Sequence, residues 1–411
     1  MSQIFSRRRG LILRDMTASL LVFLVALPLC LGIALASGAT PAQGIITGII
    51  GGIVAGSVSG AAMQVSGPAA GLTVLVFGII HDHGVAALGP AVLAAGFLQL
   101  AGGFVGAGRL VRSIPVAVVE AMLAAIGITI ASAQVHVMMD QSPHSGVFAN
   151  IAALPPAVAH ANWTPAGLAA ATILAVLVWE RAAPRALRGL PPALVGVILA
   201  SGLAAALHLQ VHHVDLPSSL LHALRAPDVQ GARGMLSIGG AISVVSLALI
   251  ASIESLLSAA AIQRMVSGAR GHADFDRELR SQGIGNMLCG AVGALPMTGV
   301  IVRSAANVSA GARSRASAVL HGVWLLALVE LFPGVLRAVP TASLAGLLAL
   351  VGVRLVSPAH IRAARAQGAL VEYGITLVVA LASSLVWGVV LGSLYVQGQK
   401  AYVKWRANER G

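Results

Sequence analysis

Charged residues are scarce in this sequence, and their scarcity excludes a water-soluble globular protein. Only 10% of the 411 residues are Asp, Glu, Lys or Arg, whereas an average soluble domain carries roughly 25%. Hydrophobic residues make up 57% of the chain, and the mean hydropathy is +0.89. A chain with so much apolar surface needs lipid as its solvent, so the sequence predicts an integral membrane protein.

Aromatic residues and cysteines are also few. Aromatics make up 4% of the chain, and the basic residues behind the net charge of +12 fall in short clusters between apolar stretches. This pattern excludes a nucleic-acid partner. Cys30 and Cys289 are far apart and fit neither a disulfide framework nor a metal site. The sequence also lacks metalloprotease and nucleophile-elbow motifs, so we expect no enzyme, no metal and no cofactor.

Apolar stretches divide the whole chain. They predict an all-α integral membrane protein with about fourteen transmembrane segments. The stretches lie near 17–37, 43–63, 66–80, 86–107, 114–135, 165–180, 190–209, 237–262, 283–295, 300–311, 316–332, 340–356, 371–382 and 384–401. The third and tenth are short, and each follows a cluster of glycine and proline.

Basic residues predict the orientation of these segments. If the N-terminus is cytoplasmic and the segments alternate in direction, 22 of the 26 Lys and Arg residues fall on the cytoplasmic side. This distribution agrees with the positive-inside rule. It places both termini in the cytoplasm of a cell with the chain in its inner (plasma) membrane. Most histidines, including His81, His83 and His212, fall in the predicted external loops, where we interpret them as polar loop residues.

The two halves of the sequence are similar in organisation. The run from Gly56 to Pro68 leads into the third segment, and the run from Gly290 to Gly299 leads into the tenth. Each half, about 14–209 and 237–403, has seven segments, and an odd number requires that the halves be inverted. Paired interrupted segments indicate a transporter's binding site at the membrane midplane. The alternative is that these glycines only allow helices to pack closely.

Helices that start inside the membrane explain why such a site would bind anions. Their first N–H groups lack partners and carry positive partial charge. We expect Ser66 to cap the third segment and Pro68 to occupy its first turn. Two such N-termini that point at one another form an anion-binding site.

Two ionisable residues fall inside predicted segments. Glu254 lies in the eighth and Arg303 in the tenth. Such residues are costly in a membrane and tend to be functional. We expect Arg303 to attract the anion, and Glu254, with Ser258 one turn later, to bind a coupling proton or Na⁺. A purely structural Glu254–Arg303 pair is the alternative.

Several motifs resemble those of the SulP anion permease family, and together they span nearly the whole chain. They are Arg14 to Leu20, Ala26 to Leu29, Val65 to Gly71, Ala251 to Ser258, Ser281 to Asn286, Arg303 to Asn307 and Ala310 to Arg313. The resemblance implies a single transport domain over 1–411 with two inverted repeats, a core domain and a gate domain. It also implies elevator-like motion, a homodimer in the lipid bilayer, and substrates such as sulfate, bicarbonate, chloride or carboxylates.

The same resemblance implies a set of site residues. The anion would lie between the third and tenth segments, with Glu254 as the acidic position of the eighth. The implied contacts are Ser66, Gly67, Pro68, Ala69 and Ala70 with Gly299, Val300, Ile301 and Arg303.

Some positions depart from the family pattern. Leu29 and Val302 stand where many relatives have glutamine and serine, so backbone N–H groups are expected to dominate anion contacts. Glu254 replaces the aspartate of Na⁺-coupled relatives, which favours protons. We also expect no STAS domain after the last segment.

The sequence therefore predicts a proton-coupled secondary transporter of an inorganic anion, either sulfate or bicarbonate. A passive anion channel and a chloride/bicarbonate exchanger on the same fold remain open. A nucleobase permease is disfavoured because the third and tenth segments offer mostly Gly, Ala and Val.

Overall fold

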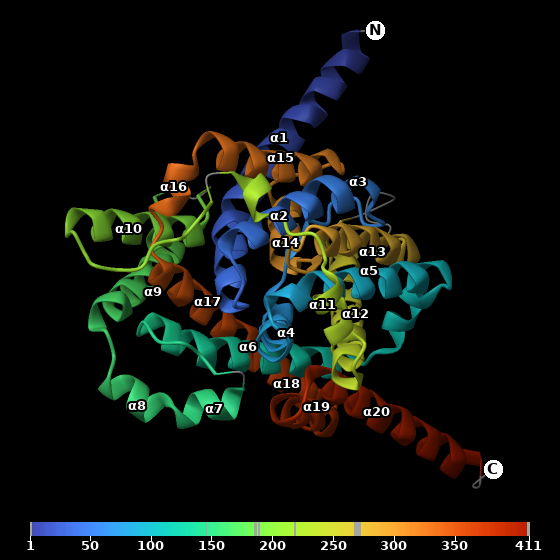
Figure 1. The fold of residues 1–411 in the computed structure, drawn as a ribbon. Helices are drawn as coiled ribbons and strands as arrows, with labels where there is room; N and C mark the ends of the chain where they lie inside the picture. Colours follow the sequence, from blue (N-terminus) through green and yellow to red (C-terminus); the bar gives the residue numbers. More distant parts are fainter. Residues whose placement is uncertain are drawn as a thin grey trace.

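The computed structural model of the chain describes residues 2–408 except 145, 185–186, 188–189, 218 and 267–272. Within these residues the chain is mostly helical and contains one small two-stranded sheet (Figure 1). The sequence-based prediction of a helical fold is confirmed. Four of the basic residues used to predict orientation, Arg185, Arg188, Arg270 and Arg410, lie outside the described residues.

Each predicted apolar stretch contains a helix. The helices are α1 (Ser2–Ala36), α2 (Pro41–Ile50) with its continuation α3 (Gly56–Val58), α4 (Thr73–His83), α5 (Leu88–Phe104), α6 (Val116–Met138), α9 (Trp163–Ala182), α10 (Pro192–Ala206), α12 (Ile238–Met265), α13 (Phe275–Ala291), α14 (Ile301–Ser309), α15 (Ala316–Leu331), α17 (Thr341–Leu355), α19 (Leu370–Ala382) and α20 (Leu385–Asn408). Shorter helices connect some of them: α7 (Val147–Ala152), α8 (Leu154–Ala159), α11 (Val229–Met235), α16 (Pro333–Arg337) and α18 (Pro358–Ala366).

Helix α13 begins earlier than the ninth apolar stretch, which was predicted to start at residue 283. Its first turns carry polar and charged side chains, including Glu278 and Gln282, which are fully buried. An apolar-run criterion cannot detect a helix whose buried face is polar. The prediction of the helix start was therefore wrong by two turns.

Seven helical stretches of the described residues are long and apolar enough to cross a membrane. They are Arg14–Ala36, Pro41–Val58, Val85–Phe104, Val116–Met138, Trp163–Ala182, Ile238–Gln263 and Thr341–Ala366. Four shorter apolar helical stretches accompany them: Ala70–His83, Pro192–Ala206, Ala316–Leu331 and Leu370–Ala382. These lengths support a membrane-embedded chain, and the number of fourteen crossings stays a prediction.

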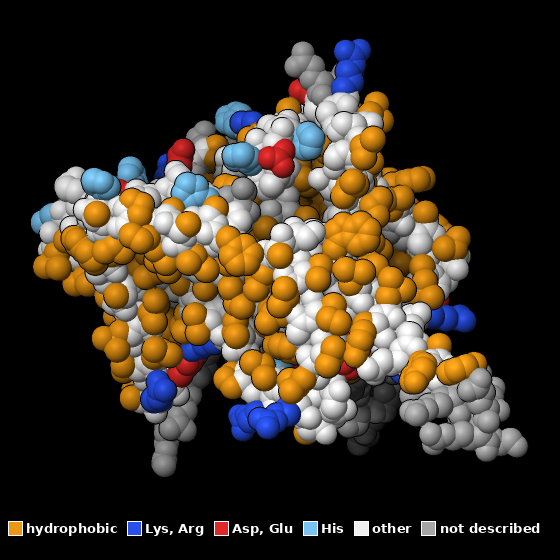
Figure 2. Space-filling model, turned by 90° about the horizontal axis from the view of Figure 1, so that it is seen from below, with side chains coloured by type: hydrophobic (Ala, Val, Ile, Leu, Met, Phe, Trp, Pro, Cys, Tyr) orange, Lys and Arg blue, Asp and Glu red, His pale blue; other side chains and the backbone are white. Residues whose placement is uncertain are grey.

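The surface has the character of a membrane protein. Large apolar side chains such as Phe104, Leu236 and Ile238 are exposed, and Figure 2 shows hydrophobic side chains across the middle of the molecule. In that view histidines gather along the upper edge, and most of the visible Lys and Arg lie along the lower and right-hand edges. This separation is what the predicted topology requires of external and cytoplasmic loops.

The sheet joins two parts of the chain that are far apart in sequence. Strand β1 (Ser66–Pro68) pairs antiparallel with β2 (Met297–Gly299), so that Ser66 faces Gly299 and Pro68 faces Met297. Both strands are buried. Each leads within a few residues into a short helix, α4 after β1 and α14 after β2.

Helices α5 and α13 pack against each other backbone to backbone. A Cβ added to Gly96 of α5 would lie 2.5 Å from the backbone nitrogen of Met287, and one added to Gly283 of α13 would lie 2.5 Å from that of Leu100. Glycine at both positions is therefore required for this approach. Helix α13 of this pair also hydrogen-bonds to both strands, through Gln282 to Ser66 of β1 and through Asn286 to Met297 of β2.

Candidate functional site

The two helix starts beside the sheet lack side-chain caps. A 3₁₀ turn (Ala70–Leu72) opens the helical run that continues as α4, and Val300 precedes α14; no side chain accepts a hydrogen bond from the first N–H groups of either. Such groups also lack partners within the helix and carry positive partial charge. The β1–β2 pairing therefore places two helix starts suited to an anion at the ends of one small sheet.

The predicted cap of the third segment was wrong. Ser66 and Pro68 lie in strand β1, before the helix begins. The Ser66 hydroxyl instead accepts a hydrogen bond from Nε2 of Gln282 at 2.8 Å. Pairing with β2 keeps this part of the chain extended, and a local capping pattern does not anticipate a partner strand 230 residues away.

Glu254 of α12 lies against the start of the α4 segment. A Cβ added to Gly71 would be 1.5 Å from the Glu254 Oε1 atom, so the carboxylate occupies the space that glycine leaves open. The side chain of Thr298 in β2 lies beside the same carboxylate, and its buried hydroxyl has no hydrogen-bond partner within bonding geometry. The structure thus places Glu254 between Gly71, which follows β1, and Thr298 of β2.

Ser258 does not join Glu254 through a hydrogen bond in the described part of the chain. Its side chain is fully buried, and its hydroxyl has no hydrogen-bond partner. The helical spacing of four residues correctly places both on α12. The role of Ser258 as a second oxygen for the coupling cation stays a prediction.

Arg303 of α14 is fully buried and contacts β1. Its Nη1 atom would lie 2.2 Å from a Cβ at Gly67, and its Nη2 atom donates to the Pro68 carbonyl at 3.4 Å. The Nε and Nη1 atoms have no hydrogen-bond partner. Among the described residues no ion pair joins Arg303 to Glu254 or to another carboxylate. The alternative of a structural Glu254–Arg303 pair is therefore not found.

The other predicted contact residues lie around the two helix starts. Ala69 is buried and Ala70 half-buried at the first start; at the second, Val300 is half-buried and Ile301 is 40% exposed. A Cβ at Gly299 would lie 1.5 Å from Nε2 of Gln64, so the Gln64 side chain occupies the space that glycine leaves open here. Because these side chains are small or apolar, any polar contact to an anion must come from backbone N–H groups.

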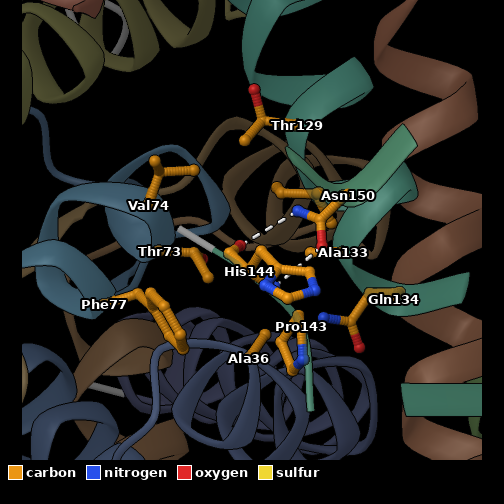
Figure 3. A pocket seen from close by; sticks show the side chains of 11 residues that line it. Ala36, Thr73, Val74, Phe77, Thr129, Ala133, Gln134, Pro143, His144 and Asn150 are labelled. Carbon is orange, nitrogen blue, oxygen red and sulfur yellow. Dashed lines mark hydrogen bonds between the residues drawn. The ribbon is translucent and has the colours of Figure 1, made fainter. Parts of the chain in front are cut away.

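A small cavity borders α4 (Figure 3). It is lined by Thr73, Val74 and Phe77 of α4, by residues of α6 such as Gln134, and by the loop that precedes α7. Asn150 holds that loop: its Nδ2 atom donates to the His144 carbonyl at 3.0 Å, and its Oδ1 atom accepts from the His144 amide at 2.8 Å. Thr73 is the first residue of α4 and lies two residues after Gly71 in the sequence.

Sequence reasoning missed a polar stripe on α13. Glu278, Gln282 and Asn286 are four residues apart, all buried, and all bonded to the strands or to the turn before β1. The signal was available, since a spacing of four places side chains on one helical face. The motif from Ser281 to Asn286 had been noted only as part of a family resemblance.

The sequence is similar to those of curated transporters. The "Putative sulfate transporter YbaR" of Bacillus subtilis is 27% identical over 348 residues, which cover 84% of this chain and 67% of that protein. The "Bicarbonate transporter BicA" of Synechocystis is 26% identical over 346 residues, which cover 80% of this chain and 60% of that protein. The chain thus spans about two thirds of the length of these curated relatives.

Structural similarity covers more of the molecule. The transmembrane domain of a cyanobacterial bicarbonate transporter, BicA, matches with a TM-score of 0.79 and 25% identity, over 92% of this chain and 97% of that domain. The proteins in these comparisons are transporters, not enzymes. The model of the sulfate permease family matches residues 12–379. The chain therefore belongs to the sulfate permease family of membrane anion transporters.

Proposed function

We propose that the chain is a secondary active transporter of a small inorganic anion, either sulfate or bicarbonate. The observation that carries the proposal is the pair of uncapped helix starts that the β1–β2 pairing brings together. The relatives named as sulfate and bicarbonate transporters support this choice of substrates. The anion binds between the two starts, between Ser66 to Ala70 and Gly299 to Ile301, where the first N–H groups of the two helices attract it. The N–H groups of Gly299 and Val300 already donate to Ser255 and Val65, so the N–H groups that follow them are the ones available.

Arg303 contributes positive potential to this site without an ion pair of its own. A buried guanidinium with no counter-ion is unfavourable in a low-dielectric environment. An anion near β1 lowers that cost, since the guanidinium lies against Gly67 and Pro68, the two residues that precede the helix start at Ala69. The charge of Arg303 thus favours occupancy of the site by an anion.

Glu254 couples the binding of the anion to the binding of a proton. Its carboxylate lies against Gly71 at one helix start, and among the described residues no ion pair joins it to a cation, so an arriving anion meets a negative charge at close range. Protonation of the carboxylate removes this repulsion, which links the binding of a proton to the binding of the anion. Alternatively, a Na⁺ ion bound by Glu254 and Ser258 neutralises the negative charge of the carboxylate.

Transport follows an elevator scheme in this proposal. The site-bearing elements β1, α4, β2, α14, α12 and α13 move as a core against a gate that contains α6. Two inverted repeats, 14–209 and 237–403, build this single domain of fourteen crossings. Both termini face the cytoplasm, and the chain works as a homodimer in the plasma membrane.

Uptake into liposomes tests the proposal. We expect the purified protein to accumulate labelled sulfate or bicarbonate, faster under an inward proton gradient. In Glu254→Gln the stimulation by the gradient is lost, because the neutral side chain cannot bind a proton. Glu330→Gln, at an exposed position of α15, is the matched control and keeps the stimulation. Uptake that is indifferent to the gradient in both wild type and Glu254→Gln favours a passive channel or an anion exchanger.

A further inference from the structure

Two carboxylates of neighbouring core helices have different surroundings. Glu254 of α12 is half-buried and lies against Gly71 and the side chain of Thr298. Glu278 of α13 is fully buried and surrounded by donors. The proposed function uses the first carboxylate and leaves the second without a role.

Both oxygens of Glu278 are occupied. Oε2 accepts from the backbone N–H groups of Gly60 at 2.8 Å and Ala61 at 3.3 Å, and from the Ser59 hydroxyl at 2.6 Å. Oε1 accepts from the side-chain amides of Gln64 at 3.0 Å and Gln282 at 2.6 Å. Backbone N–H groups can only donate, so this environment favours the ionised carboxylate and leaves little space for an incoming proton.

Two arginines hold the same turn as Glu278. Arg277 donates to the Val58 carbonyl at 3.0 Å, and Arg315 donates to the Ser59 carbonyl at 2.9 Å. Among the described residues neither arginine forms an ion pair with Glu278. The negative charge of Glu278 is therefore stabilised by its hydrogen-bond donors.

The hydrogen bonds continue from Glu278 to the anion site. Gln282, one turn along α13, donates both to Glu278 and to the Ser66 hydroxyl of β1. Asn286, one turn further, holds β2: its Oδ1 atom accepts from the Met297 N–H at 2.7 Å, and its Nδ2 atom donates to the Met297 carbonyl at 3.0 Å. One face of α13 therefore fastens both strands.

We propose that Glu278 is a fixed, ionised positioning residue that holds residues 59–66 and, through Gln282, sets the place of β1 in the anion site. It neither touches the anion nor carries the coupling ion. This inference rests on the proposed anion site, but its first consequence is structural and independent of the substrate. If the carboxylate is neutralised, the 59–66 segment loosens and β1 loses its fixed position relative to α13.

Hydrogen–deuterium exchange in detergent provides the first test. We expect faster exchange of the amides of residues 59–68 in Glu278→Gln, because an amide cannot accept from all five donors. In Gln282→Leu, which keeps the carboxylate, the increase is confined to β1. Ile284→Ala, at a partly exposed position of the same helix, serves as the control and exchanges like wild type. Wild-type exchange over 59–68 in both variants would overturn the proposal.

Kinetics of uptake provide the second test. For Gln282→Leu we expect KM for the anion to rise roughly tenfold with a smaller change in kcat, because the site is displaced and its chemistry is unchanged. Stimulation by a proton gradient is retained in Glu278→Gln and in Gln282→Leu. Loss of that stimulation in Glu278→Gln alone would show that Glu278 carries the ion and would contradict the proposal.

The two tests separate this inference from the proposed function. If wild type takes up neither sulfate nor bicarbonate, the proposed substrates are wrong, and the exchange experiment still decides the role of Glu278. If Glu278→Gln does not fold, Glu278→Asp and Gln282→Leu decide it together. Glu278→Asp keeps the charge on a shorter side chain, so we expect exchange between that of wild type and that of Glu278→Gln.

Discussion

Gly71→Ala is expected to abolish most transport while leaving the fold intact. The added Cβ would lie 1.5 Å from Oε1 and 2.6 Å from Cδ of Glu254, and neither distance is tolerable. The atoms it meets are the end of a flexible side chain, so the carboxylate moves away and the backbone stays in place. We expect uptake to fall at least about tenfold, since a displaced charge at a site costs more than ~1.4 kcal/mol.

Two other glycines provide the controls for this variant. Nothing lies within 4 Å of a Cβ at Gly78 of α4, so Gly78→Ala should transport like wild type. A Cβ at Gly96 would lie 2.5 Å from a backbone nitrogen of α13, so Gly96→Ala should lower the melting temperature in detergent. A Gly71→Ala protein that transports at the wild-type rate, or that melts as early as Gly96→Ala, would contradict the assigned contact.

The contrast among these glycines illustrates what the sequence could predict. The glycine-rich runs predict interrupted third and tenth segments, and the structure places strands β1 and β2 at the ends of these runs. Their partners could not be inferred. Gly67 meets Arg303, Gly71 meets Glu254, and Gly299 meets Gln64, and all three contacts join segments about 180 to 240 residues apart in the chain. Such contacts depend on tertiary packing, which a local pattern does not specify.

The helices themselves were more predictable than their polar contacts. Long apolar runs such as α1 and α6 are set by the length that a bilayer demands, so composition alone identifies them. The start of α13 and the role of Ser66 were missed for one shared reason. Both involve polar groups buried against other polar groups, where Gln282 bonds to Ser66 and Glu278. Hydropathy identifies what faces lipid and carries no signal for such internal networks.

Arg303→Met is expected to keep or raise the thermal stability of the protein and to weaken anion binding, whereas most core substitutions lower stability. The guanidinium is fully buried, two of its three nitrogens have no hydrogen-bond partner among the described residues, and its Nη2 atom donates to the Pro68 carbonyl at a long 3.4 Å. Replacement of buried charged groups by apolar residues of similar volume is often neutral or stabilising by about 1–4 kcal/mol. We therefore expect Arg303→Met to melt in detergent at or above the wild-type temperature when no anion is present.

The affinity for the anion should fall in Arg303→Met. Without the positive charge behind Gly67 and Pro68, the two helix starts attract an anion only through their partial charges. The stabilisation that sulfate or bicarbonate gives to wild type, measured as a rise in melting temperature with anion concentration, should be largely lost. Uptake should fall by roughly a factor of ten or more.

Val302→Ala is the control for Arg303→Met, because the two residues are adjacent in α14. Val302→Ala, next to Arg303 but 59% exposed, should change neither the melting temperature nor its dependence on the anion by much. If Arg303→Met melts several degrees below wild type and still responds to the anion, Arg303 is a structural residue. A stable protein without an anion response instead means that the arginine is retained at a cost to the empty transporter. Its charge then finds a counter-ion only when the substrate is bound, because no carboxylate of the described chain pairs with it.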